Sequence, residues 1–136
     1  MKLNAYLFFN GQCKEAFQFY ETLLGGHIVS MLPHRGSPAE GQTAPEWLDK
    51  IMHARMSVGD GVLMASDAPP GHFQQPQGFT VNISVADPSE AERIFHALAE
   101  NGNTMMPIQE TFWALRFGMT TDRFGIPWMI NCEKPM

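Results

Sequence analysis

Apolar and polar residues follow two periodicities along the chain, and these predict the same order of elements twice. Residues 2–11 are a strand-like run that ends at Asn10-Gly11. Residues 13–26 predict a helix, because apolar residues recur at helical spacing before a glycine pair: Cys13, Phe17, Tyr20, Leu24, Gly25 and Gly26. Residues 27–33 then predict a second, short strand.

The second copy begins with a strict alternation in residues 79–85, which predicts a strand with one apolar and one polar face. Asp87 is the expected N-cap of the helix that follows, with Pro88 at its first position and Glu90 as the capping-box partner. An apolar stripe continues the helix through Ala91, Ile94, Phe95 and Leu98. Gly102 is expected to close it.

Each copy ends in a predicted strand pair. Residues 51–58 and 62–67 flank the turn at Gly59-Asp60-Gly61, and residues 110–121 and 127–133 flank residues 122–125. The chain therefore predicts an α+β fold of two βαβββ modules, about 1–68 and 78–136, within a single domain. Two segments rich in Pro and Gly connect strands, residues 33–45 and 68–78, and residues 45–50 predict one helical turn.

The bulk composition restricts the partners and the compartment. A net charge of −5 and scattered Lys and Arg argue against nucleic acid as a partner. The chain has no apolar stretch near the roughly 20 residues that a membrane-spanning helix needs, and its start does not predict a signal peptide. We therefore expect a cytoplasmic protein with Cys13 and Cys132 as free, half-buried thiols, although a disulfide between them stays possible.

Three segments carry a resemblance to a known family: residues 5–26, residues 62–70 and, most specifically, residues 109–131, "QETFWALRFGMTTDRFGIPWMIN". Together they resemble the PhnB-like family of the vicinal oxygen chelate superfamily, which includes glyoxalase I, extradiol dioxygenases and antibiotic resistance proteins. The resemblance implies a cup-shaped mixed sheet with the helices outside. It also implies that reactions take place in the cup, where His or Glu side chains from the first and last strands of the modules hold a divalent metal.

The positions that match these metal ligands have lost their donors. The His positions fall at Ala5 and Thr80, and the Glu positions fall at Met129 and near Ala65 (Met64 if the register shifts). A methyl, a hydroxyl and a thioether do not hold a hard divalent ion. We therefore predict no metal cofactor at this site, while a non-standard site built from His53 and a loop histidine stays an alternative.

Strand alternation predicts which side chains line the cup. His53, Arg55 and Ser57 should project to the face opposite Met52, Ala54, Met56 and Val58, and Thr80, Asn82 and Ser84 should do the same in the second module. The expected apolar walls are Leu7, Phe9, Trp113, Trp128 and Met129, although either Trp could instead be a core or dimer residue. Arg55 and Arg116 are the expected clamps for an anionic ligand. A polar sheet face can also be merely solvated.

Three functions are consistent with these residues. The leading hypothesis is a metal-free homodimer that binds a small organic molecule in the cup through Arg55, Thr80, Asn82, Trp113, Arg116 and Met129, and acts by sequestration or sensing. The alternative is an isomerase, lyase or hydrolase in which His53 is the catalytic residue, oriented by Glu110 or Asp67, or in which a non-standard metal acts. Asp67 could equally be a helix or turn cap before Ala68-Pro69. A third is a structural dimer with a filled cup. Some similar proteins are labelled methyltransferases that act on a ubiquinone precursor. The sequence does not support that activity here, because it has no glycine-rich strand-to-helix turn to hold a nucleotide-like cofactor.

Overall fold

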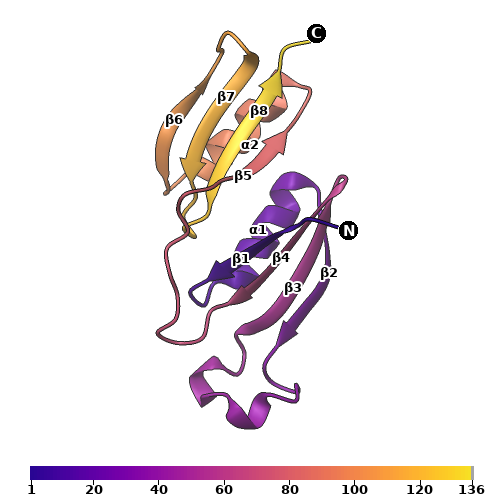
Figure 1. The fold of residues 1–136 in the computed structure, drawn as a ribbon, viewed down its shortest axis with the longest axis vertical. Helices are drawn as coiled ribbons and strands as arrows, with labels where there is room; N and C mark the ends of the chain where they lie inside the picture. Colours follow the sequence, from indigo (N-terminus) through magenta and orange to yellow (C-terminus); the bar gives the residue numbers. More distant parts are fainter. Residues whose placement is uncertain (136) are drawn as a thin grey trace. The chain divides into compact units, whose positions relative to one another are not determined.

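Each half of the chain folds into a four-stranded mixed sheet with one α-helix on one of its faces (Figure 1). The computed structural model describes residues 1–135 and separates into two units, Met1–Gln74 and a second that begins at Gln75. The first unit contains β1 (Ala5–Phe9), α1 (Cys13–Leu24), β2 (His27–Pro33), β3 (Ile51–Val58) and β4 (Gly61–Asp67). The second contains β5 (Val81–Ser84), α2 (Pro88–Ala99), β6 (Asn103–Gln109), β7 (Ala114–Thr121) and β8 (Pro127–Glu133). The predicted α+β class and the βαβββ repeat are confirmed.

The two sheets share one strand order, β1-β4-β3-β2 in the first unit and β5-β8-β7-β6 in the second. In each sheet the first strand pairs in parallel with the last, so that Ala5 is in register with Leu63 and Val81 with Trp128. The other pairs are antiparallel. A parallel pair needs a long crossover, and here the helix and two further strands supply it.

Helix α1 forms because its apolar residues fall on one stripe, and that stripe packs on the first sheet. Phe17 and Tyr20 are fully buried, and the ring of Phe17 meets the edge of Phe9 on β1 at a centroid distance of 6.3 Å. The stripe ends at the buried Leu23, while Leu24, which we predicted to be part of it, is only half-buried. Gly25 ends the helix in the left-handed conformation, with a φ of 65°, as the glycine pair predicted.

Helix α2 begins as predicted, and only the roles of Glu90 and Gly102 differ. The Asp87 carboxylate accepts a hydrogen bond from the backbone N–H of Ser89 at 3.0 Å, and Pro88 is the first helical residue. Glu90 pairs with Arg93 one turn along the helix, and so the predicted capping box is wrong. The left-handed residue after the helix is Asn101, with a φ of 59°, and Gly102 follows it. The predicted apolar stripe is buried.

Strand alternation gives each sheet one face that packs on the helix of its own unit and one that is turned away from it. On β3, Ala54 and Met56 are fully buried beneath the helix side, whereas His53 and Arg55 project to the opposite face, as predicted. We call the face turned away from the helix the open face. In the first sheet it consists of Tyr6, Phe8, Ser30, Leu32, His53, Arg55, Ser57, Val62, Met64 and Ser66. In the second it includes Asn82, Ser84, Met106, Phe117, Met119, Met129 and Asn131.

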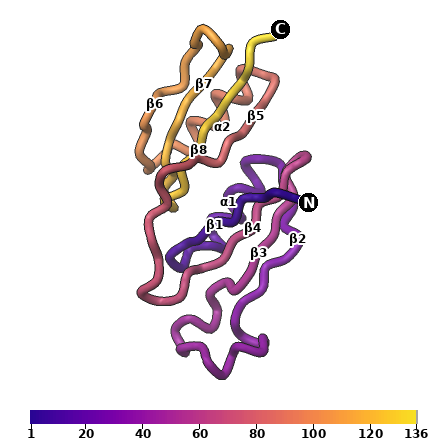
Figure 2. Tube along the Cα trace, in the orientation of Figure 1, coloured from indigo at the N-terminus to yellow at the C-terminus, as the bar shows by residue number. Residues whose placement is uncertain are grey.

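The chain between β2 and β3 leaves the first sheet in a long excursion that has structure of its own (Figure 2). It contains two short 3-10 turns, Glu40–Gln42 and Pro45–Trp47, and the second confirms the predicted helical turn. The Arg35 guanidinium donates to Asp49 at 2.8 Å across the base of the excursion. Within residues 1–135, no helix is both long and apolar enough to cross a membrane.

Candidate functional site

The open face of the first sheet brings an imidazole, a phenol and a guanidinium onto one surface. The hydroxyl of Tyr6 on β1 and Nδ1 of His53 on β3 share a hydrogen bond of 3.2 Å, and the two rings stack at 5.8 Å. Arg55, two residues along β3, donates from Nη1 to the sulfur of Met64 at 3.8 Å. Tyr6 and Met64 are themselves register partners across β1 and β4. The site is therefore built from three neighbouring strands.

No carboxylate of the first unit orients His53 in this arrangement. Asp67 is buried on the helix side of the sheet, where one oxygen accepts from the backbone N–H of Cys13 at 2.9 Å and the other from that of Ile51 at 2.8 Å. It therefore joins the start of α1 to β3 and is not turned toward His53, which corrects its predicted orienting role. Glu110 pairs with Lys134 at 3.5 Å in the second unit.

The side chains predicted to form the apolar wall of the cup in the first sheet lie on the helix side, and their sequence neighbours lie on the open face instead. Leu7 and Phe9 are almost completely buried, and Phe9 packs on α1. Their neighbours Tyr6 and Phe8 occupy the open face, where their exposed fractions are 36% and 51%. The prediction that Leu7 and Phe9 line the cup is therefore wrong.

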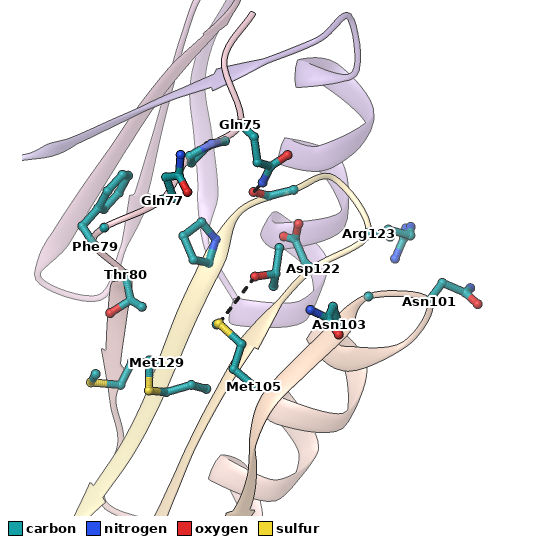
Figure 3. A pocket seen from close by; sticks show the side chains of 17 residues that line it. Gln75, Gln77, Phe79, Thr80, Asn101, Asn103, Met105, Asp122, Arg123 and Met129 are labelled. Carbon is teal, nitrogen blue, oxygen red and sulfur yellow. Dashed lines mark hydrogen bonds between the residues drawn. The ribbon is translucent and has the colours of Figure 1, made fainter.

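The second unit carries a pocket of about 900 Å³. Thr80 and Met129, both predicted ligand-binding residues, line it together with Met105 and Phe79 (Figure 3). Met119 lines it as well. Met119 and Met129 are register partners across β7 and β8, which places both thioethers on the open face. Neutral amides complete much of the rim, from Gln75, Gln77, Asn101 and Asn103. Two charged side chains, Asp122 and Arg123, also line the pocket. The pocket is therefore a thioether and aromatic surface whose surrounding hydrogen-bonding groups are mostly uncharged.

The turn between β7 and β8 fixes one end of this pocket. The buried Asp122 carboxylate accepts from the backbone N–H groups of Phe124 and Ile126 at 2.9 and 3.0 Å, and from the Trp128 indole at 2.8 Å. Gly125 lies at the tip of the turn with a φ of 92°, a conformation that favours glycine. The Gln75 side chain donates to the Gly125 carbonyl at 2.7 Å. These bonds hold the start of β8, and with it Met129, in place.

Three further residues that were predicted to line the cup lie in three different environments. Trp128 is 1% exposed, lies on the helix side with Ile130 and belongs to the core, which was the alternative prediction for it. Trp113 is 44% exposed and stacks edge-on with Phe117 at 5.3 Å. Arg116 points to α2, where its Nε donates to Glu92 at 2.9 Å, so its guanidinium is already engaged.

Asn82 lies where its alternation predicted, next to Met129 in the sheet register. Its amide donates to the Ser84 hydroxyl at 2.9 Å along the same open face. Asn82 does not line the pocket itself. A ligand role for Asn82, Arg55, Arg116, Trp113, Thr80 or Met129 stays a prediction.

The donor set on these strands does not fit the divalent metal that the resemblance implies. The open-face side chains on the first and last strands include Tyr6 and Met64 in one unit and Asn82 and Met129 in the other. Thioethers are soft ligands, and a hard divalent ion takes carboxylates, carbonyls or imidazoles instead. Among residues 1–135, no three His, Cys, Asp or Glu side chains are grouped to hold an ion.

Cys13 is a buried nucleophile that these sites do not use. Burial raises the pKa of its thiol, and the nearby charge of Asp67 raises it further. The thiol therefore stays protonated at neutral pH, which makes it unreactive, since the thiolate is the nucleophile. Both cysteines are free, as expected, but they are fully buried rather than half-buried.

Comparison with known proteins assigns the chain to a family. Residues 1–131 match the family described as 3-demethylubiquinone-9 3-methyltransferase. The chain belongs to this PhnB-like family. Protein YjdN of Escherichia coli (strain K12) is 36% identical to it over 142 residues, covering 98% of this chain and 97% of YjdN.

Solved structures of the PhnB-like family and of more distant proteins show the same fold. The crystal structure of protein PA1353 from Pseudomonas aeruginosa is 48% identical, with a TM-score of 0.90 over 99% of both chains. A putative 3-demethylubiquinone-9 3-methyltransferase, PhnB protein, from Bacillus cereus is 23% identical, with a TM-score of 0.81 over 97% of this chain and 99% of that one. A glyoxylase/bleomycin resistance protein/dioxygenase domain from Frankia sp. EAN1pec is 14% identical, with a TM-score of 0.65 over 98% of each chain. The glyoxalase/bleomycin resistance fold predicted from the sequence is thereby confirmed.

Sequence reasoning missed several residues of these sites. Tyr6 and Phe8 were missed because all of residues 6–9 are apolar or aromatic, so period-two patterning did not show which face was which. Met105 and Met119 were missed because thioethers are as common in cores as in pockets. The only available signal was the strand pairing, which puts Met119 beside Met129.

Proposed function

We propose that the protein is a metal-free homodimer that binds a small, largely uncharged organic molecule on the open face of its second sheet. The pocket of about 900 Å³ beside Thr80 and Met129 carries this proposal. Its size lies in the range of small-molecule sites, which are mostly apolar with a few polar groups that orient the ligand. Sequestration or sensing in the cytoplasm would follow from binding alone.

The chemistry of the lining selects the ligand class. Flexible thioethers adapt to different shapes and make favourable contacts with aromatic rings. Met119 and Met129 provide such a surface from adjacent strands, and Phe79, 53% exposed, adds an aromatic ring. The amides of the rim match carbonyl, hydroxyl and ring-nitrogen groups on a ligand. Asp122 and Arg123 also line the pocket, and the Asp122 carboxylate is occupied by bonds within its own turn. A flat, partly polar molecule fits these groups.

Methyl transfer, which the family description names, has less support from this chain. A methyl donor such as S-adenosylmethionine is usually held at a glycine-rich turn between a strand and a helix. The turn from β1 to α1 contains one glycine, Gly11, and the turn from β5 to α2, residues 85–87, contains none. The residues present do not fit such a donor at these turns, and we derive no methyl-transfer step.

Thermal unfolding of the purified chain across a panel of metabolites and antibiotics tests the proposal. A ligand at a hundredfold excess over its Kd should stabilise the fold by about 2.7 kcal/mol. Met129→Trp fills the pocket and should weaken the binding of a hit at least about tenfold, a loss of about 1.4 kcal/mol. Val29→Trp adds the same bulk at an exposed strand position of the first unit and should leave the affinity unchanged.

Two results would contradict the proposal. One is a panel in which no compound raises the unfolding temperature, which would favour a purely structural protein. The other is a hit that binds Met129→Trp as tightly as the unaltered chain, because that hit would occupy another site. Sedimentation of the unaltered chain measures the proposed dimer independently of any ligand.

A further inference from the structure

Arg55 has no carboxylate partner among the residues that the structure describes. Its guanidinium is half-buried on the open face of the first sheet, and its one hydrogen-bond acceptor is the sulfur of Met64, at 3.8 Å. Carboxylates hold three of the other arginines, in the pairs Arg35–Asp49, Arg93–Glu90 and Arg116–Glu92. A thioether is a weak acceptor, so most of the five N–H donors of Arg55 remain available.

The side chains around Arg55 form two rows across the strands. One row, read through the strand register, is Tyr6, Met64, Arg55 and Ser30. In the next row Phe8 is in register with Ser66, and Leu32 is in register with His53. The Tyr6–His53 hydrogen bond ties the two rows together, and it leaves Nε2 of His53 for another partner. A guanidinium and an imidazole therefore lie beside the exposed rings of Tyr6 and Phe8.

The charge on this face has one sign. Every residue of the first unit is described, and its open face contains no Asp or Glu. The chain as a whole carries a net charge of −5, so a carboxylate-free face with an arginine at its centre is a local exception. A guanidinium binds carboxylate or phosphate oxygens in a bidentate manner, and partial burial strengthens that bond relative to water.

We propose that Arg55, His53 and Tyr6 form a binding site for a small aromatic oxyanion on the open face of the first sheet. Arg55 takes two oxygens of the anionic group, and Nε2 of His53 or the Tyr6 hydroxyl contacts that group from the side. Phe8 and the Tyr6 ring provide the surface for the flat part of the ligand. The site lies in a different unit from the pocket beside Met129, so it goes beyond the function proposed above and does not depend on it.

NMR titration of the ¹⁵N-labelled full chain with benzoate tests this site directly. Saturable shifts should appear at the Arg55 side-chain Nε–H and at the backbone amides of β1, β3 and β4. Benzamide, which has the same shape without the charge, should bind at least about tenfold more weakly, since the charge-assisted bond is lost. Phenyl phosphate in a parallel titration distinguishes the two oxyanions: tighter binding of either one supports the site and names its preferred group.

Matched variants connect binding to the guanidinium. Arg55→Gln should lower benzoate affinity at least about tenfold, and Arg55→Lys should recover only part of it, because an ammonium cannot bind in a bidentate manner. Arg35→Gln removes an exposed arginine that faces Asp49 and should leave the titration unchanged. Equal binding of benzoate and benzamide by the unaltered chain, or no saturable shift at Arg55 with either anion, would overturn the proposal whatever the variants do. Unchanged benzoate affinity in a folded Arg55→Gln would do the same.

Discussion

Replacing Asp122 with Asn should destabilise the second unit more than its small change in size suggests. In the native turn, Oδ1 accepts from two backbone N–H groups, those of Phe124 and Ile126, and Oδ2 accepts from the Trp128 indole. The asparagine carbonyl can keep the two backbone bonds, but its NH₂ then faces the indole N–H. Two buried donors meet with no acceptor between them.

The magnitude follows from the bonds that change. A hydrogen bond to a charged group contributes about 1.5–3 kcal/mol, and a buried donor left without a partner costs about 1–3 kcal/mol. The two retained bonds also weaken, since they no longer end on a full charge. Asp122→Asn should therefore lower the free energy of unfolding by about 3–5 kcal/mol, a large share of the stability of a small protein.

A double-mutant cycle separates the indole bond from the general cost of the change. Trp128→Phe removes the indole N–H, so in the Asp122→Asn background it also removes the donor conflict. The double variant should be less destabilised than the sum of the single ones by about 1.5–3 kcal/mol. Urea unfolding followed by far-ultraviolet circular dichroism at one protein concentration measures all four chains. Asp60→Asn, in the exposed turn between β3 and β4, is the control for the charge and should change little.

Additivity of the two single changes to within about 0.5 kcal/mol would refute this reasoning. It would mean that the Asp122 carboxylate and the Trp128 indole do not act as a pair in solution, despite their 2.8 Å separation.

Three other predictions use the same unfolding assay. Gly118→Ala should lower the free energy of unfolding by about 1–3 kcal/mol, because its Cβ would lie 2.8 Å from the Phe95 ring. Gly41→Ala is the control, since a Cβ there meets open space and should change the stability little. Equal effects of the two changes would contradict this prediction. Asp67→Asn should cost about 1–3 kcal/mol by weakening its bonds to the N–H groups at the starts of α1 and β3, and hydrogen exchange of the Cys13 amide should accelerate. The folded chain raises the pKa of Cys13, so it keeps the thiol proton to higher pH than the unfolded chain does. Stability should therefore fall above about pH 8.5, by at most about 1.4 kcal/mol per pH unit, and Cys13→Ala should flatten this dependence; identical pH profiles would count against it.

The sequence predicted those parts of the fold that local chemistry decides. The Asp87-Pro88 start of α2, the glycine stop after α1 and the hairpin at Gly59-Asp60 each depend on a few adjacent residues. Alternation of apolar and polar residues also placed Arg55 and Thr80 correctly, because their strands are polar on one side only.

The prediction of which sheet face a side chain occupies was wrong where both sides of a strand are apolar. Leu7 and Phe9 alternate with Tyr6 and Phe8, so a reading that is wrong by one residue looks the same in the sequence. The face that Arg116 occupies could not be predicted for a different reason. An arginine is expected on the helix side of a sheet only where a carboxylate can pair with it. That partner is Glu92 on α2, and the sequence of β7 alone does not show that Glu92 lies next to it. The pocket also depends on the parallel pairing of β5 with β8, two strands distant in sequence, which no local pattern reveals.

The parallel pairing of first and last strands has a consequence for how the chain is made. On the ribosome, β1 emerges first but must wait for its neighbour, since Ala5 is paired with Leu63 and Phe9 with Asp67. Until then the nascent strand exposes both of its edges and its apolar side chains, which is the condition under which chaperones bind growing polypeptides. Once residue 67 has cleared the exit tunnel, the first sheet has all its strands, and it can close before β5 emerges from the ribosome.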